Sequence, residues 1–342
     1  IRLDAVAAVA APVADFYSSV RLDCDLYRKF VQYSQSPEGT KLGGARRRML
    51  TQTLLDFELG GANLPTAQKE RIAEIDRLLA VKTQKFSENV LDDTKSFVLN
   101  ITDERDLSGL PAVAVAVAGK KAAAHGVSGW DFTLEQSSYV AFMCYADSDA
   151  LREKLWRASS RLASDGQFSN WQLMSEILEL RAEKASILGR SDFADLVLER
   201  RMAKNGAKAL AFVADLHSKF AAAFDNEWRM LLDFAVQNGY LKTPEMVPWR
   251  TAYITEKLRA EKYGFDPESL RPYFPMDAVM AGMFEVCRRL YGLHVEKIKM
   301  TAPAWNESVE LYEVVSRAGD RLGLFYADFR PRPDKRAGAW MN

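Results

Sequence analysis

The sequence is poor in the residues that most often build metal and redox sites. Its 342 residues include three cysteines and three histidines. Cys24, Cys144 and Cys287 are far apart and none stands in a C-x-x-C pair, which excludes the paired spacing of zinc knuckles and dithiol redox motifs. We therefore expect three buried free thiols in a reducing compartment.

The chain also lacks an excess of charge and a long apolar run. Lys and Arg together number 46, Asp and Glu also number 46, and the formal net charge is zero. Proteins that bind nucleic acids usually carry a basic excess, so the balance argues against such a partner. No apolar run reaches the roughly 18 residues that a membrane span needs. We expect a cytoplasmic protein with neither nucleic acid nor membrane as a partner.

Local catalytic motifs are absent as well. The Gly-Gly pairs at 43–44 and 60–61 match neither G-x-G-x-x-G nor a P-loop. There is no H-E-x-x-H, and His125, His217 and His294 are far apart. For each histidine we expect a structural or solvated role. A zinc site assembled from scattered side chains, and a Cys–His nucleophile pair that meets only in the fold, stay open as alternatives.

Two charged clusters have ordinary explanations. Three arginines at 46–48 predict a solvated helix face rather than an anion site. Glu176, Glu179 and Glu183 follow one another at helical spacing with basic residues beside them. We expect a charged face with pairs inside its own helix, not an acid/base couple.

What the sequence does have is helical periodicity over most of its length, with alternating apolar runs near the end. This predicts a mainly α fold that becomes α+β at the C-terminal end. The turn at 316–320 predicts a β-hairpin between the last two runs. Strands are expected at 96–102, 129–135, 293–300, 308–315 and 321–329. A first helix is expected at 3–36, a second ends at about 59, a third begins at 66, and a fourth lies in the Ala-rich segment before 129. Further helices are expected at 148–164, 169–188, 191–203, 206–238, 247–263 and 276–291.

Seven segments form an ordered set that covers about residues 10–342. They are LLDFELGGANLP (54–65), 71–97, 151–166, 176–203, EKYGFDPESLRPYFP (261–275), MFEVCRRLYGL (283–293) and GLFYADFRPRPDKRAGAWMN (323–342). The most telling pieces are LRPYFP and KRAGAW. Together the segments resemble the thimet oligopeptidase family of zinc peptidases, with most likeness to its bacterial oligopeptidase A branch.

The resemblance implies a clam-shell enzyme whose deep channel admits short, unstructured peptides and cleaves their internal bonds. Zinc is held in that family by an H-E-x-x-H helix and a later glutamate, and the glutamate of the motif activates the metal-bound water. In the family this helix follows the Gly-Ala-Trp segment that stands here at 338–340. We therefore expect an internal part of a longer enzyme that holds no zinc and is inactive alone, and assign no catalytic or metal-binding residue.

The resemblance also implies where a peptide would bind. Gly338, Ala339 and Trp340 would lie nearest the active centre, beside an exposed strand edge that can pair with an extended peptide. Tyr273, in the RPYFP turn, is the fourth candidate substrate-binding residue. For Trp340 and Tyr273, a purely structural role is the alternative.

The same resemblance suggests a domain organisation. Residues 1–146 would form a helical N-terminal region with a small β insertion near 97–135, and 147–292 a helical channel wall. Residues 293–342 would begin the sheet of the catalytic domain. Two other functions stay open: a non-catalytic peptide-binding module, and one half of a split peptidase whose partner chain covers a large apolar surface.

Overall fold

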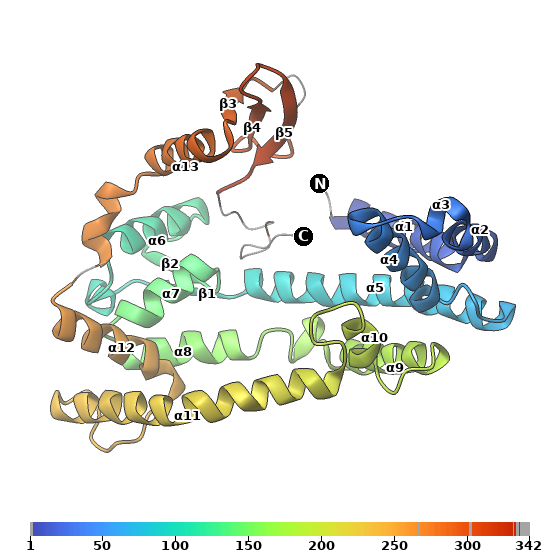
Figure 1. The fold of residues 1–342 in the computed structure, drawn as a ribbon. Helices are drawn as coiled ribbons and strands as arrows, with labels where there is room; N and C mark the ends of the chain where they lie inside the picture. Colours follow the sequence, from blue (N-terminus) through green and yellow to red (C-terminus); the bar gives the residue numbers. More distant parts are fainter. Residues whose placement is uncertain (1–2, 266, 301–302, 331, 333–334, 336–342) are drawn as a thin grey trace. The chain divides into compact units, whose positions relative to one another are not determined.

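The computed structural model describes residues 3–265, 267–300, 303–330, 332 and 335. Most of them are helical, which confirms the mainly α prediction (Figure 1). The longer helices are α1 (Leu3–Leu22), α2 (Cys24–Gln35), α4 (Gly44–Gly60), α5 (Thr66–Ser96), α6 (Ala112–Ala124), α7 (Gln136–Tyr145), α8 (Asp149–Ser160), α9 (Trp171–Ile187), α11 (Gly206–Gln237), α12 (Pro248–Tyr263) and α13 (Met276–Tyr291). Short helices are α3 (Pro37–Thr40), η1 (Glu104–Leu107), η2 (Gly166–Phe168), α10 (Phe193–Leu198) and η3 (Pro267–Tyr273).

The described strands form two small antiparallel sheets. The first pairs β1 (Val98–Ile101) with β2 (Trp130–Thr133) and confirms the predicted β insertion. The second has the order β3 (His294–Ile298), β4 (Glu310–Val315) and β5 (Arg321–Ala327). Its last two strands are the predicted hairpin, closed by a bond from Ser316 N to Asp320 O of 2.8 Å.

The chain divides into two compact units. The first contains residues 1–93 and 161–229, and the second contains 94–160 and 230–342. The three regions expected from the sequence, with boundaries after 146 and 292, stay a prediction. Within the described ranges, no helix combines the length and apolar character that crossing a bilayer requires.

The first predicted helix, 3–36, is wrong as a single helix. Asp23 interrupts it: its carboxylate accepts hydrogen bonds of 2.9 Å from the backbone N–H groups of Asp25 and Leu26. This is an N-cap that starts α2 afresh. The predicted stop at the second Gly-Gly pair is confirmed, because Gly61 ends α4 with φ 96°, a conformation that glycine adopts without a Cβ penalty.

The acidic face of α9 takes its basic partners from α5, not from its own helix as we expected. Arg71 binds Glu183 through two parallel bonds, Nε–Oε1 of 2.6 Å and Nη2–Oε2 of 2.7 Å. Lys82 pairs with Glu176, and the two helices are joined again through Lys184. Helical spacing alone places charges on one face but does not say which helix lies opposite it.

The cysteine prediction is partly corrected. Cys24, Cys144 and Cys287 are free thiols, but each is half-buried rather than buried. Desolvation raises the pKa of Cys144 above its ordinary value. This makes its reactive thiolate scarcer at neutral pH.

Candidate functional site

The candidate site lies at the C-terminal sheet, where the sequence places a peptide-binding edge. Helix α13 covers one face of this sheet, and Met280, Tyr312 and Ala327 form the buried centre of the contact. The Tyr312 ring lies 5.2 Å from Phe284 of α13 and stacks at 5.2 Å on Phe325 of β5. Aromatic contacts at these distances fix β4 and β5 against the helix, so the strand edge is held by a packed layer.

Strand β5 presents an alternating apolar row to solvent. Leu322, Leu324 and Tyr326 are each at least half exposed, and they alternate with Gly323 and with Phe325, whose ring packs on the other face. Within the described part of the chain, β5 pairs with β4 on one side and with no strand on the other. An extended peptide can add to such an edge through its backbone, while exposed side chains provide contacts for alternate residues.

A hydrogen bond within β4 and an ion pair between β3 and β4 both involve the carboxylate of Glu310. The Tyr312 hydroxyl donates to Glu310 Oε2 at 2.5 Å, and Lys297 of β3 pairs with the other carboxylate oxygen at 2.6 Å. The hydrogen bond to Glu310 raises the pKa of Tyr312 to about 12, with burial acting in the same direction. Tyr312 is therefore a neutral donor at physiological pH, and Glu310 remains ionised between its two partners.

Asp328, the residue after β5, accepts hydrogen bonds from several side chains near it in the fold. Arg332 donates two bonds to its carboxylate, of 2.8 and 2.6 Å, and Trp305 Nε1–H donates a third of 2.9 Å. The bonds from Arg332, followed by those from Trp305 and Lys335, lower the pKa of Asp328 despite the opposing effect of its partial burial. The Trp305 ring also lies 5.3 Å from Tyr326, so this cluster borders the exposed apolar row.

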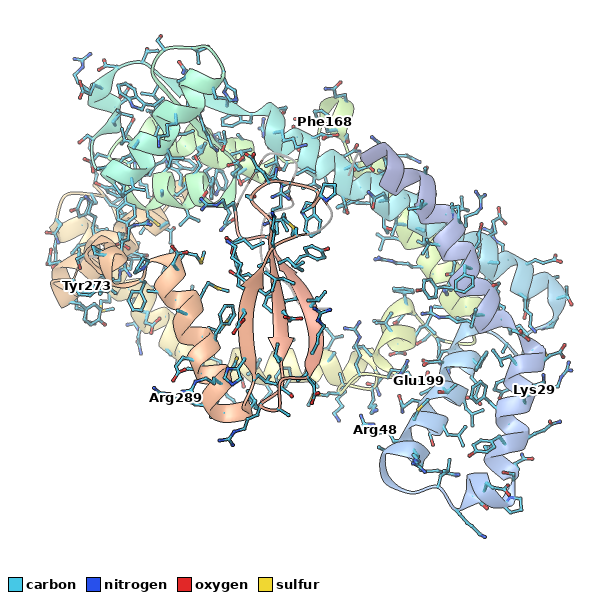
Figure 2. All side chains as sticks on the ribbon, turned by 90° about the horizontal axis from the view of Figure 1, so that it is seen from above. Lys29, Arg48, Phe168, Glu199, Tyr273 and Arg289 are labelled. Carbon is cyan, nitrogen blue, oxygen red and sulfur yellow. The ribbon has the colours of Figure 1, made fainter. Side chains whose placement is uncertain are left out.

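Of the four predicted substrate-binding residues, only Tyr273 is among the described ones. Gly338, Ala339 and Trp340 lie outside the described residues. Tyr273 ends η3 with 76% of its surface exposed, and Figure 2 labels it in the turn that leads to α13. Exposure leaves its ring available for contact but does not by itself assign a role.

The described residues do not fit a zinc ion. In the part of the chain that the structure covers, no group of three His, Cys, Asp or Glu side chains is arranged to hold a metal. His125 is engaged instead by Asp131, at 2.6 Å from Nδ1 to Oδ2, next to the β1–β2 pair. His217 is exposed on α11, and His294 begins β3. No chemical step is assigned to a metal here.

The sequence reasoning missed the exposed row on β5 as a candidate site. Its signal was present, because Leu322, Leu324 and Tyr326 alternate, but alternation alone does not tell which face is covered. Placing α13 over the opposite face requires the long-range contact between Phe284 and Tyr312.

Comparison with known proteins gives a consistent family. The sequence pattern described as Peptidase family M3 matches residues 142–342. Oligopeptidase A of Escherichia coli (strain K12) is 35% identical over 322 residues, which are 93% of this chain and 47% of that protein. The organellar oligopeptidase A (chloroplastic/mitochondrial) of Arabidopsis thaliana is 34% identical over 93% of this chain and 41% of its own length. Dipeptidyl carboxypeptidase of Escherichia coli (strain K12) is 26% identical over 97% of this chain and 49% of its own length.

The chain thus spans about half the length of the curated relatives it matches. The family match covers α8, α12, α13 and the C-terminal sheet, including the segments around Tyr273 and 338–340. The similarity to oligopeptidase A was expected from the ordered segments. The chain belongs to peptidase family M3.

Proposed function

We propose that this chain is part of a zinc metallo-oligopeptidase that hydrolyses internal bonds of short, unstructured peptides. Membership of family M3 and the likeness to proteins named oligopeptidase A support this reaction class. Zinc is the expected metal of the complete enzyme, and the cytoplasm is its expected location. The part of the chain that the structure describes offers no group of metal ligands, so its own contribution would be to bind the peptide.

The observation that carries the proposal is the edge of β5. Its outer backbone groups, which pair with no other strand of the described residues, and the exposed Leu322, Leu324 and Tyr326 suit an extended peptide, which needs both backbone partners and apolar contacts at every second residue. Tyr273, Gly338, Ala339 and Trp340 are further proposed contacts to the peptide.

The test is the binding of a fluorescently labelled, unstructured short peptide, followed by fluorescence anisotropy. Leu324→Asp places a charge in the exposed row and should weaken binding by about tenfold, because one buried charge in an apolar contact costs at least 1.4 kcal/mol. Leu178→Asp is the matched control, since Leu178 is exposed on α9 in the other unit. Equal loss in both variants, or no loss in either, would contradict the proposed edge.

A non-catalytic peptide-binding module is the second candidate, and the same strand edge favours it. Mass spectrometry of the peptide after incubation with the complete protein of which this chain would be a part, with added zinc and with a chelator, separates the two functions. Zinc-dependent cleavage at internal bonds supports the peptidase. Binding without cleavage supports the module or a split peptidase, and adding a zinc-containing partner that restores cleavage distinguishes the latter.

A further inference from the structure

Away from the sheet, the first unit contains a cavity of about 480 Å³, within the range of small-molecule sites. Its walls come from α1, α4, α5, α9 and α10 and from the residues that follow α10. All of its lining residues belong to this unit. Its charged lining consists of Arg21, Lys184, Arg200, Arg201, Asp56 and Asp76.

Two of the four cations are already paired. Arg200 binds Asp56 of α4, and its Nε donates to Gln52 at 3.2 Å. Lys184 binds Asp76 of α5, which also accepts a bond of 3.2 Å from the Ser18 hydroxyl. Both lining carboxylates are therefore paired with a cation. These ion pairs join α4 to the residues after α10, and α5 to α9.

The other two cations have no such partner in the part of the chain that the structure describes. Among the described residues, neither Arg21 nor Arg201 has a carboxylate within ion-pair distance. The lining has four cations and two anions, which leaves a formal excess of two positive charges. Guanidinium groups match carboxylate and phosphate through paired N–H donors, so this excess is suited to an anion rather than only to solvent.

The backbone brings Arg21 into this position. A Cβ at Gly60, the last residue of α4, would lie 2.8 Å from the Cβ of Arg21, which is closer than two such carbons approach. Glycine at this position therefore allows the end of α1 to lie against the end of α4. The remaining lining is apolar, from Leu59 on α4 and from Leu196 and Val197 on α10.

We propose that this cavity binds a small organic dianion: two carboxylate or phosphate charges for Arg21 and Arg201, on a short apolar stem that faces the leucine and valine side chains. The site requires neither the metal nor the peptide edge of the proposed function. Its occupancy is therefore a separate property of the protein, and its failure would leave the peptidase proposal unaffected.

Isothermal titration calorimetry with defined probes tests the site. Glutarate supplies two carboxylates on an apolar stem, propyl phosphate supplies a phosphate dianion on an apolar stem, and glutaramide is the neutral analogue of the first. We expect one-to-one binding of at least one dianion and none of glutaramide; the better dianion tells carboxylate from phosphate ligands. Failure of both dianions to bind at about 10 mM would overturn the proposal.

Substitution of the two lining arginines without a partner among the described residues tests whether the dianion binds in this cavity. Arg21→Gln and Arg201→Gln should each weaken it by about tenfold, since each removes one charge-assisted contact. The matched control is Arg48→Gln, an exposed arginine on α4 (labelled in Figure 2) that stands eight residues, or about 12 Å, before Asp56. Equal weakening by the control would mean a diffuse surface effect and would refute the site.

A gain-of-affinity variant guards against misfolding as an explanation. Asp56→Asn removes a lining carboxylate and releases Arg200 for the ligand, so it should tighten binding by several-fold. A poorly folded protein cannot bind more tightly. Unchanged or weaker binding in Asp56→Asn would count against the proposal.

Discussion

The guanidinium carbon of Arg152 lies 4.0 Å from the centre of the Tyr253 ring. Arg152 is buried on α8 and also donates to the carbonyl oxygens of Ala146 and Trp249, the latter at 3.2 Å, and to Asp149 at 2.8 Å. One charged side chain thus connects α8 to the end of α7 and the start of α12. Such a charge is tolerated inside a protein only while its partners are in place.

Arg152→Met should lower the free energy of unfolding by about 3 kcal/mol, because it removes a donor from the buried carbonyl oxygen of Ala146 and from the half-buried one of Trp249. Asp149 keeps Arg250 as a partner, so no carboxylate is left unpaired. The measurement is urea unfolding of the chain. Arg157→Met, on the same helix but half exposed, should cost within about 1 kcal/mol. Similar losses in both variants would contradict a special role for the buried position.

The helices and strands were largely predictable because their signals are local. The predicted helix at 276–291 has the bounds of α13, since Pro275 precedes it and Gly292 ends it in the left-handed conformation. Helix α7 was not predicted, because the apolar residues in Gln136–Tyr145 do not form a one-sided stripe. The break at Asp23 was hidden inside an apolar pattern that continues across it.

The sites were predictable only where a resemblance supplied them. The partners of Glu176 and Glu183 lie about a hundred residues earlier in the chain, on α5, and spacing on one helix cannot reveal them. The cavity around Arg21 and Arg201 likewise needs helices that are distant in sequence. The family resemblance identified the C-terminal region, but the exposed face of β5 required knowing which side α13 covers.

Stability in acid should depend on Asp149. Hydrogen bonds from Arg250 hold the pKa of this carboxyl below its ordinary value of 3.8, although partial burial opposes them. A lowered pKa in the folded state contributes stability above the unfolded value, and this contribution is lost as pH falls through the folded pKa. We therefore expect the free energy of unfolding to fall as pH decreases below about 4.

Arg250→Gln should make that acid loss smaller, because the folded pKa of Asp149 then lies nearer its unfolded value. Urea unfolding at a series of pH values between about 5 and 2 gives the slope. Arg317→Gln removes an equal charge from the exposed turn after β4 and serves as the control. A slope that Arg250→Gln leaves unchanged would show that this pair does not govern the acid response.

Gly61 should tolerate alanine poorly. Its φ of 96° is unfavourable for a residue with a Cβ, and that atom would lie 2.9 Å from Leu64 Cδ1 and 3.1 Å from Ile72 Cδ1. We expect Gly61→Ala to destabilise the chain by about 2 to 3 kcal/mol. Gly264→Ala isolates the backbone effect, because Gly264 has φ 58° with nothing within 4 Å, and should cost about 1 kcal/mol. Equal losses would mean that crowding against Ile72 is relieved at no cost.

Substitution of Tyr273 distinguishes a role in peptide binding from a purely structural role. Because its side chain is 76% exposed, Tyr273→Ala should leave the free energy of unfolding within about 0.5 kcal/mol of the unchanged chain. If its ring contacts the peptide, the same variant should weaken binding of the labelled peptide by about fivefold, the value of one aromatic contact near 1 kcal/mol. Tyr17→Ala, an exposed tyrosine on α1 in the other unit, is the control and should leave peptide binding unchanged. A large loss of stability in Tyr273→Ala would favour the structural role, whereas unchanged stability with unchanged peptide binding would remove Tyr273 from the proposed contacts.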